Sequence, residues 1–392
     1  MDPTIRSILD GSLATYRHEL LVSNMQGIRI HSQHGRADDN VPIFHARLMK
    51  HLLSQAGIPS SYTELPGKNH FFDGIMSTEP LQHFYREELD GNHTRPNSSL
   101  NFNLTVARPA DTGPMYGVHV HSLNTPGRLG KVSVSIVHEH NSSKCKVRTT
   151  NIRRLSVPWS DQYCSDLQID GQSVRISPGS QQSVFFQDSK HTWRNASSEE
   201  RITISQYGGM DNILRTQGRF CILADDASRK IALQISRNLC QYFYADTEIR
   251  SLNDTSAMQG CGNRINVFQR SSLDLTSTRS DSVPRTGNDK PMLSIMDHDG
   301  NVYTYDSKNG LGAVYLHDTG SGDLELDVWG SDARGLEIAA RLVPMLTGVG
   351  QPDFVIADKT MLEQGAGGVL AMGFFIGLLP GDLTASTNSY FT

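Results

Sequence analysis

The first ninety residues alternate between helical and strand patterns of apolar and polar positions. Residues 5–24 predict a helical stretch, residues 27–31 a short strand and residues 43–56 an amphipathic helix. A second strand over 61–65 and a closing helix over 79–89 follow. Strand, helix, strand and helix with short connections indicate parallel strands joined by a right-handed crossover.

The pattern changes after residue 90. Residues 90–99 are polar, contain glycine and proline, and are typical of a linker. From residue 100 to 207, short runs alternate with a period of two, which favours an antiparallel β sandwich. We expect strands at 101–107, 117–123, 131–137 and 147–157, and a hairpin turn at Asp170-Gly171.

The last part mixes strand and helix patterns and predicts a small α+β domain. The expected elements are a strand at 219–224, a helix at 227–245 capped by Asp225 or Asp226, a hairpin turn at Asp299-Gly300, strands at 311–317 and 323–329, a helix from Ser331 or Asp332 to 346, and a strand at 353–357. Residues 271–288 are rich in Ser, Thr, Asp and Arg and predict a long mobile loop. The predicted domains are therefore 1–92, 99–210 and 215–380.

Composition limits the function classes. Apolar residues make up 37% of the 392 residues, the net charge is -5, and the basic residues are scattered. This balance is typical of an ordinary soluble protein and gives no basic patch for nucleic acid. No run approaches the ~20 apolar residues of a membrane span. The oligomeric state is not determined by any of these features.

Cysteines and glycosylation signals favour an extracellular location. The residues from Met1 onward show neither the basic start nor the apolar run of a signal peptide. The five cysteines contain no C-x-x-C pair, so we expect no zinc site. They are either buried free thiols or up to two disulfides with one leftover thiol, and for a secreted protein we expect at least one disulfide. Six N-x-[ST] sequons support secretion. The cysteines are Cys145, Cys164, Cys221, Cys240 and Cys261, and the sequon residues are Asn92, Asn97, Asn103, Asn141, Asn195 and Asn253.

Two loops in the first domain carry the strongest chemical signal. Residues 34–42 read HGRADDNVP, and residues 66–70 read PGKNH. Each loop follows a predicted parallel strand, and neighbouring strands lie ~4.8 Å apart, so a carboxylate on one loop can reach an imidazole on the other. The two segments resemble the prolyl oligopeptidase family, especially its dipeptidyl-peptidase branch. The resemblance implies that Asp38 is the triad acid and His70 the general base.

The resemblance also implies a fold and a substrate. Residues 1–92 are identified as the C-terminal part of an α/β-hydrolase sheet, so the expected fold class is a truncated α/β sheet followed by a β-rich sandwich and a mixed α+β domain. The implied substrate is a peptide or an ester, without cofactor or metal. However, no G-x-S-x-G nucleophile motif occurs in the chain. The family order of serine, aspartate and histidine places the serine before Met1.

Other interpretations of these residues stay open. The Asp38-Asp39-Asn40 run before Pro42 also fits a helix N-cap, and His70 alone also fits a loop histidine without a task. The missing serine indicates either a truncated chain or a protein that has lost activity. We therefore weigh a serine peptidase, an esterase on the same fold and a non-catalytic extracellular binding protein.

The remaining motifs favour structural roles. His119/His121 and His138/His140 form two H-x-H pairs. In a simple hairpin of 117–123 with 131–137 the pairs would lie ~10 Å apart along the strand, which indicates surface histidines rather than a metal site. Glycines at 348–350 and 365–368 predict close backbone packing, because they match no phosphate-binding motif. Residues 297–301 (DHDGN) lack the distal Glu of a calcium loop and predict a hairpin turn.

Overall fold

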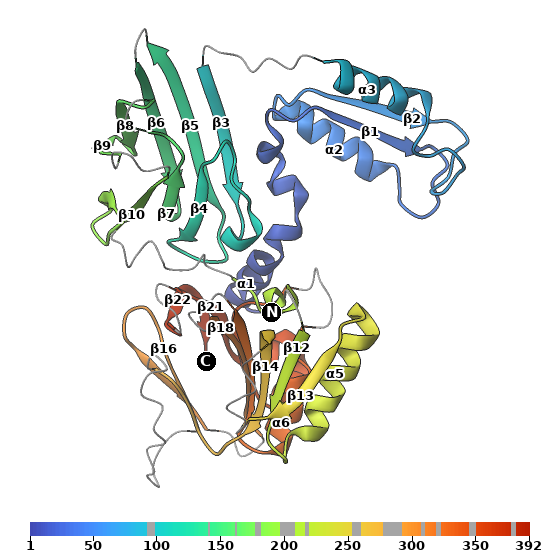
Figure 1. The fold of residues 1–392 in the computed structure, drawn as a ribbon. Helices are drawn as coiled ribbons and strands as arrows, with labels where there is room; N and C mark the ends of the chain where they lie inside the picture. Colours follow the sequence, from blue (N-terminus) through green and yellow to red (C-terminus); the bar gives the residue numbers. More distant parts are fainter. Residues whose placement is uncertain are drawn as a thin grey trace.

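The computed structural model contains three sheet-bearing regions, arranged as Figure 1 shows. It describes residues 1–392 except 92–98, 140–141, 161–162, 177–181, 197–207, 216–218, 253–259, 277–291, 307–309, 319–322, 345–349 and 378–381. None of the helices within the described ranges combines the length and the apolar character needed to cross a bilayer.

The first region is a small parallel α/β unit. Its elements are β1 (Ile30–Gly35), α2 (Phe44–Gln55), β2 (Ser60–Leu65) and α3 (Glu79–Asp90). The two strands pair in parallel from Ile30↔Ser60 to Gly35↔Leu65, so the predicted strand-helix-strand-helix order is confirmed. A small core of Val22, Leu53 and Ile58 holds the unit together.

The N-terminal helix does not belong to this unit. The helix expected over 5–24 ends early: α1 spans Pro3–Leu13, and three short 3-10 helices follow at Ala14–Tyr16, His18–Leu20 and Val22–Met25. Ile5 and Ile8 are fully buried in the core of the C-terminal sheet, and Figure 1 shows α1 beside β21 and β22. The predicted grouping of residues 1–92 is therefore wrong for α1, because its apolar face packs against a distant sheet.

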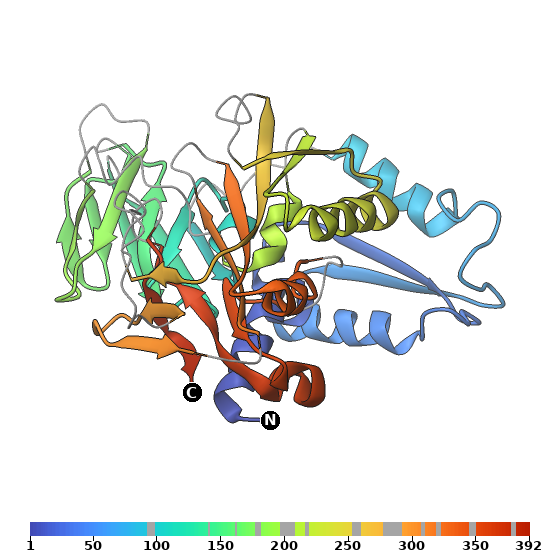
Figure 2. The ribbon, with the colours of Figure 1, turned by 90° about the horizontal axis from the view of Figure 1, so that it is seen from below.

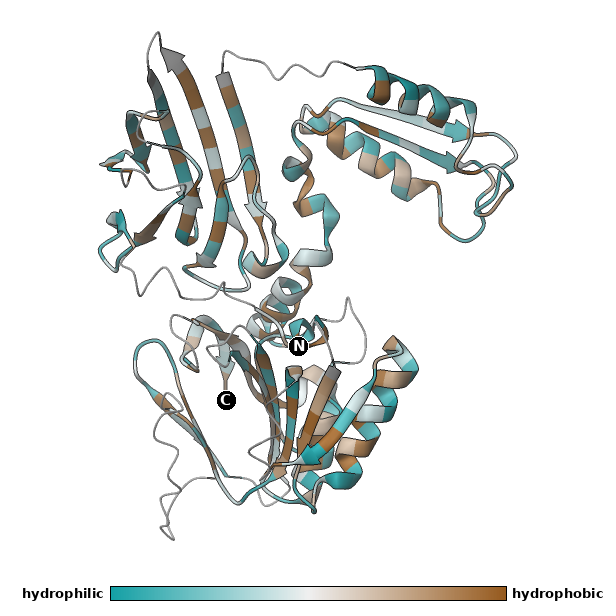
Figure 3. Cartoon of the chain, in the orientation of Figure 1, coloured by the Kyte–Doolittle hydropathy of each residue, from teal (hydrophilic) through white to brown (hydrophobic). Residues whose placement is uncertain are grey.

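The middle region is a sandwich of two sheets with the strand orders β3-β5-β6-β8-β9 and β11-β10-β7-β4. Figure 3 shows alternating hydrophobic and hydrophilic bands along β3 and β5, as expected for strands with one buried face. Phe102, Phe185 and Trp193 are buried between the sheets. The strands are β3 (Ser99–Val106), β4 (His119–Leu123), β5 (Gly130–Glu139), β6 (Ser142–Thr150), β7 (Ile152–Val157), β8 (Asp166–Ile169), β9 (Gln172–Val174), β10 (Ser183–Gln187) and β11 (Trp193–Asn195).

One strand prediction in the sandwich is wrong. The strand expected over 147–157 breaks at Asn151, whose φ of 58 separates β6 and β7 into different sheets. The simple hairpin considered for 117–123 with 131–137 does not form, because β4 pairs with β7 while β5 pairs with β3 and β6. The Asn151 side chain accepts from Thr125 N at 2.7 Å and donates to Thr125 O at 3.0 Å, which fixes the crossing from β4 to the other sheet. The turn at Asp170-Gly171 is confirmed between β8 and β9.

The C-terminal region is built on an eight-stranded mixed sheet in the order β13-β12-β14-β19-β18-β20-β21-β22. The first three pairs are parallel and the remaining four are antiparallel. The sheet runs to Phe391, past the predicted limit of 380. Its strands are β12 (Arg219–Ala224), β13 (Thr247–Ser251), β14 (Cys261–Gln269), β18 (Gly312–Asp318), β19 (Leu324–Gly330), β20 (Phe354–Ala357), β21 (Val369–Phe375) and β22 (Ala385–Phe391).

Helices cover one face of this sheet, and a small three-stranded sheet packs on part of the other. The helices α5 (Arg229–Phe243) and α6 (Ala333–Ala340) share a core with Ile222, Ile265 and Leu326, and Figure 2 shows them on one side of the sheet. The second sheet, of β15 (Leu273–Leu275), β16 (Leu293–Met296) and β17 (Val302–Tyr305), packs against Trp329 and Phe354 on the opposite face. The short helix α7 spans Thr360–Gln364.

Most of the helix and turn predictions here are confirmed. Asp332 caps α6 by accepting from Gly335 N at 2.7 Å. The expected capping of α5 by Asp225 or Asp226 is wrong, because Ser228 is its N-cap; Asp225 accepts from Ser228 N at 2.8 Å in the turn before the helix. The helix expected to reach 346 ends at Ala340 instead. Asp299-Gly300 turns the β16–β17 hairpin. Of the loop expected over 271–288, residues 273–275 form β15, and residues 277–288 lie outside the described residues.

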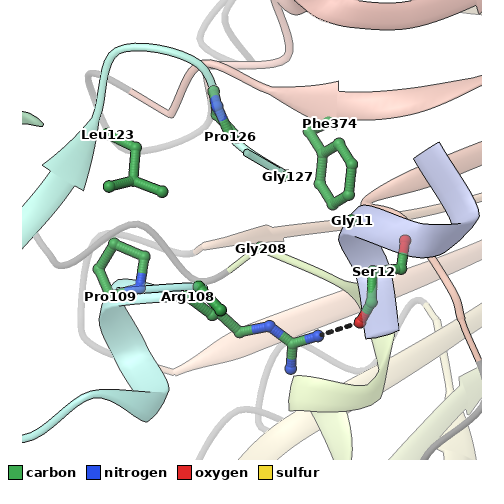
Figure 4. A pocket seen from close by; sticks show the side chains of 10 residues that line it. Gly11, Ser12, Arg108, Pro109, Leu123, Pro126, Gly127, Gly208 and Phe374 are labelled. Carbon is green, nitrogen blue, oxygen red and sulfur yellow. Dashed lines mark hydrogen bonds between the residues drawn. The ribbon is translucent and has the colours of Figure 1, made fainter. Parts of the chain in front are cut away.

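A buried ion-pair network joins α1, the sandwich and the C-terminal region. Arg108 contacts Asp211 through Nη2 and Oδ1 at 3.0 Å and Asp111 through Nη1 and Oδ2 at 3.2 Å. It also donates to the carbonyl of Ser12 on α1 at 3.4 Å. Figure 4 shows this contact at the rim of a pocket that residues of all three parts line, among them Phe374 on β21.

Candidate functional site

The two loops that carry Asp38 and His70 lie side by side at the carboxyl ends of β1 and β2. The strands end in register at Gly35 and Leu65. Beyond them, Arg36 N donates to Leu65 O at 2.9 Å and Ala37 N donates to Lys68 O at 2.9 Å. Backbone hydrogen bonds therefore hold the two loops together independently of their side chains.

The predicted contact between Asp38 and His70 is confirmed. Asp38 Oδ2 lies 3.0 Å from His70 Nδ1. Because a carboxylate only accepts, Nδ1 carries the proton, and Nε2 on the other side of the ring is left to accept one. The His70 side chain is 33% exposed, so this nitrogen can be reached from outside. The catalytic roles of both residues stay predictions.

Asp38 is held as a buried carboxylate. Its side chain is only 5% exposed, and Oδ1 accepts from Val41 N at 2.8 Å and from Asn40 N at 3.0 Å. The hydrogen bond from Val41 N, with further contributions from His70 and Asn40, lowers the pKa of Asp38 against the opposing effect of desolvation. The helix-cap interpretation fails, because α2 begins at Phe44 with Ile43 as its N-cap and without a side-chain cap bond.

His34 is a site residue that the sequence prediction did not assign. Its Nε2 lies 3.0 Å from Val41 O and 3.2 Å from Asp38 Oδ2. A carbonyl oxygen accepts only, so Nε2 carries the proton that these two oxygens share. His34 therefore orients the carboxylate that contacts His70. Its position four residues before Asp38, at the start of the quoted motif, was the signal available in the sequence.

Gly35 allows the close approach of the two loops. A Cβ added there would lie 2.5 Å from the carbonyl oxygens of both Lys68 and Asn69. We expect Gly35→Ala to push the loops apart, to lower the stability of residues 30–90 by about 1–3 kcal/mol and to break the Asp38–His70 contact. Urea denaturation and a crystal structure of the variant measure both effects. Gly113→Ala is the matched control, because no atom lies within 4 Å of the added Cβ; an unchanged contact in Gly35→Ala would contradict the prediction.

The lowered pKa of Asp38 predicts a pH dependence of stability. The folded pKa lies below the ordinary value of 3.8, so ionised Asp38 stabilises the fold above about pH 4, and this stabilisation is lost as the pH falls through the folded pKa. Asp38→Asn keeps an acceptor oxygen for Asn40 N and Val41 N but has no charge to titrate. Melting temperatures measured between about pH 2 and pH 6 should fall less steeply with acid in Asp38→Asn than in the wild type. Parallel curves would show that Asp38 is not the titrating group.

The described histidines of the two H-x-H pairs belong to different sheets of the sandwich. His119 and His121 lie on β4 with ring centroids 4.6 Å apart, whereas His138 belongs to β5 in the other sheet. His140 lies outside the described residues. Burial lowers the pKa of His121 to about 4, with His119 and Arg154 adding to the effect, so His121 is neutral at pH 7.

The other predicted motifs have structural roles. Asp297 Oδ1 accepts from Asp299 N and Asn301 N, each at 2.9 Å, and so builds the expected hairpin turn. Gly368 packs closely on the Thr360 carbonyl, as expected for the second glycine segment. Of the first segment, residues 348 and 349 lie outside the described residues.

The prediction of at least one disulfide is confirmed. Two bonds form, Cys145–Cys164 and Cys221–Cys261, with Cα separations of 6.0 and 5.7 Å. Cys240 is the remaining thiol. Of the six sequon asparagines, Asn103 and Asn195 lie on exposed strand positions, and the other four lie outside the described residues.

The sequence prediction missed a buried cluster in the C-terminal sheet. His317 on β18 and Glu325 and Asp327 on β19 bring one ligand atom each within 4.8 Å of one another. The sequence contained a signal for it, because strands were expected at 311–317 and 323–329. Glu325 and Asp327 are two residues apart and therefore share one face of the second strand, opposite Leu324 and Leu326.

Comparisons with known proteins give a location but no activity. No protein-family model matches the chain. A protein of Arthroderma benhamiae named an uncharacterized secreted protein is 35% identical over 376 residues, which are 92% of this chain and 40% of that protein. The chain thus spans about two fifths of the length of this relative. The relative and the two disulfides confirm the predicted extracellular location.

Proposed function

We propose that Asp38 and His70 are the acid and the base of a serine hydrolase of the prolyl oligopeptidase kind, and that a polypeptide segment outside residues 1–392 supplies the nucleophilic serine. The observation that carries this proposal is the 3.0 Å contact between the two side chains. They come from loops at the carboxyl ends of adjacent parallel strands, where α/β enzymes place their catalytic groups.

The geometry suits each step of acyl transfer. Asp38 fixes the His70 tautomer with the proton on Nδ1, so Nε2 accepts the serine hydroxyl proton as the serine oxygen attacks the substrate carbonyl. Asp38 then stabilises the imidazolium that forms. When the acyl-enzyme bond is made, His70 Nε2 returns the proton to the leaving amine or alcohol. Water repeats the sequence and releases the acid.

The free edge of β1 supports the proposal that a further segment docks there. Within the described residues β1 pairs only with β2, so its other edge offers unpaired backbone groups for a further strand. Large apolar side chains on the same unit are exposed, among them Phe71 at 76% and Phe44 at 60%. Phe71 packs edge-on against the His70 ring at a centroid distance of 4.5 Å. A nucleophile-bearing strand paired in parallel at this edge of β1 would end at the same carboxyl edge of the sheet as the loops of Asp38 and His70.

Peptides are the proposed substrates, and an ester would pass through the same steps. Asp38, His70 and the serine act on the acyl carbonyl, which amides and esters share. The choice between them depends on contacts to the leaving group. Those contacts would come from the segment that also brings the serine.

Active-site labelling tests this proposal. Residues 1–392 and a protein extended upstream in the same reading frame are each treated with a fluorophosphonate probe. We expect no labelling of residues 1–392 and labelling of one serine, within a G-x-S-x-G motif, in the extended protein. An extended, folded protein without labelling would contradict the proposal. Labelling of residues 1–392 at one serine, lost in His70→Ala, would place the nucleophile within this chain instead.

A further inference from the structure

The buried cluster of His317, Glu325 and Asp327 has the geometry of a metal site. His317 Nε2 lies 3.4 Å from Glu325 Oε2 and 3.4 Å from Asp327 Oδ2. The exposed fractions of the three side chains are 3%, 6% and 0%. A nitrogen and two carboxylate oxygens therefore converge on one point inside the protein, on the face of the sheet opposite α5 and α6.

A buried imidazole nitrogen faces the two carboxylates without a hydrogen bond. His317 Nε2 has no hydrogen-bond partner within the described part of the chain, although the side chain is only 3% exposed. On the other side of the ring, Nδ1 faces the carbonyl oxygen of Asp318 at 3.4 Å, which is an acceptor for the proton of the Nδ1-H tautomer. In that tautomer the lone pair of Nε2 faces two acidic oxygens, an arrangement that a cation between them would stabilise.

The separations fit ligands of one metal ion. Ligand atoms arranged tetrahedrally at ~2.0–2.1 Å around a zinc ion lie ~3.3–3.4 Å from one another. The two nitrogen–oxygen separations of 3.4 Å agree with this spacing, and the three ligand atoms all lie within 4.8 Å of one another.

Side chains from the neighbouring strand β14 hold the carboxylates in position. Arg264 Nη2 lies 2.6 Å from Glu325 Oε1, and Asn266 Nδ2 donates to Asp327 Oδ1 at 2.6 Å. Asn266 also makes a longer contact of 3.3 Å with Glu325 Oε2. In each carboxylate the oxygen that faces His317 is therefore oriented by close contacts of β14 with the other oxygen, and in Glu325 also by the longer contact with Asn266. Such outer contacts are typical of metal-binding carboxylates.

We propose that His317, Glu325 and Asp327 bind a Zn²⁺ ion that stabilises the C-terminal sheet. One imidazole and two carboxylates are ligands of the zinc class, and the nitrogen ligand disfavours Ca²⁺ and Mg²⁺. The ion would tie β18 and β19 together and, through Arg264 and Asn266, hold them against β14. The site lies outside the parallel unit and is independent of the proposed hydrolase activity.

Metal analysis of the whole chain tests this site. Residues 1–392, with both disulfides formed, are stripped with a chelator and titrated with Zn²⁺, and bound metal is measured by mass spectrometry. The variants are His317→Gln and Asp327→Asn. The matched control is His121→Gln, a half-buried histidine whose Nε2 lies 2.9 Å from Ser156 Oγ. We expect about one equivalent in the wild type and the control, and about a 10–100-fold or greater loss of affinity in the two variants.

A spectroscopic measurement on the wild type remains decisive if the variants do not fold. X-ray absorption of the Zn²⁺ form should show nitrogen and oxygen neighbours at ~2.0–2.1 Å without sulfur. Co²⁺ in place of Zn²⁺ should give the intense visible bands of a tetrahedral site. A folded wild type that retains no Zn²⁺, or folded variants that bind it as tightly as the wild type, would overturn the proposal.

Discussion

Replacing His70 with alanine should reduce turnover on the order of a million-fold in a protein that contains both residues 1–392 and the serine. The reason is that His70 Nε2 is the group placed to take the serine proton, while Nδ1 is held by Asp38. Without this base the serine hydroxyl is a weak nucleophile at neutral pH. The change is measured as kcat for a chromogenic dipeptide substrate and as the rate of fluorophosphonate labelling.

Two further variants separate catalysis from folding. Asp38→Asn should lower kcat by about 10⁴-fold, because the uncharged side chain neither selects the tautomer nor stabilises the imidazolium. His83→Ala is the matched control: this histidine on α3 is 69% exposed and contacts Glu87 on the same helix. We expect it to keep full activity. If His70→Ala retained more than about a hundredth of the wild-type kcat, the assignment of the base would be wrong.

A large loss of stability is expected when Arg108 is replaced. Its guanidinium is buried among Asp111, Asp211 and the Ser12 carbonyl. Arg108→Met leaves buried carboxylates without this cation, which costs about 3–5 kcal/mol of unfolding free energy. Because Ser12 lies on α1 and Asp211 lies in the Met210–Leu214 3-10 helix before β12, the loss should also loosen α1 from the C-terminal sheet. Urea denaturation followed by circular dichroism measures the stability.

Arg215 offers the matched comparison for Arg108. It pairs with the same Asp111, but its side chain is 50% exposed. An ion pair at that exposure contributes about 0–1 kcal/mol, so Arg215→Met should change the unfolding free energy by no more than this amount. Equal losses in the two variants would show that burial of Arg108 does not determine its contribution.

The parallel unit could be predicted because its geometry is local. A strand, a helix and a second strand in direct succession fix the parallel register, and that register brings the loops of Asp38 and His70 together. The contact between Asp38 and His70 could therefore be predicted from their spacing of 32 residues. The role of His34 could not be predicted from the strand order alone. It depends on the turn that brings Val41 O within 3.0 Å of His34 Nε2.

Long-range pairing could not be predicted in the same way. Alternation shows which face of β4 and β5 is buried, but it does not show that the two strands belong to opposite sheets. Likewise, the apolar face of α1 gives no information on which core it enters, and Ile5 and Ile8 pack more than two hundred residues away from their own position in the chain. The strands that carry His317, Glu325 and Asp327 were predicted. The burial of these side chains was not, because it depends on elements from the whole C-terminal region.

The most direct test of the central claim is a crystal structure of the extended protein after reaction with a fluorophosphonate. The phosphonylated serine marks the nucleophile, and its distance from His70 Nε2 can then be measured. We expect the serine Oγ within about 3–4 Å of Nε2, with Asp38 still bound to Nδ1. A labelled serine more than about 8 Å from His70 would show that Asp38 and His70 do not form the acid–base pair of a serine hydrolase.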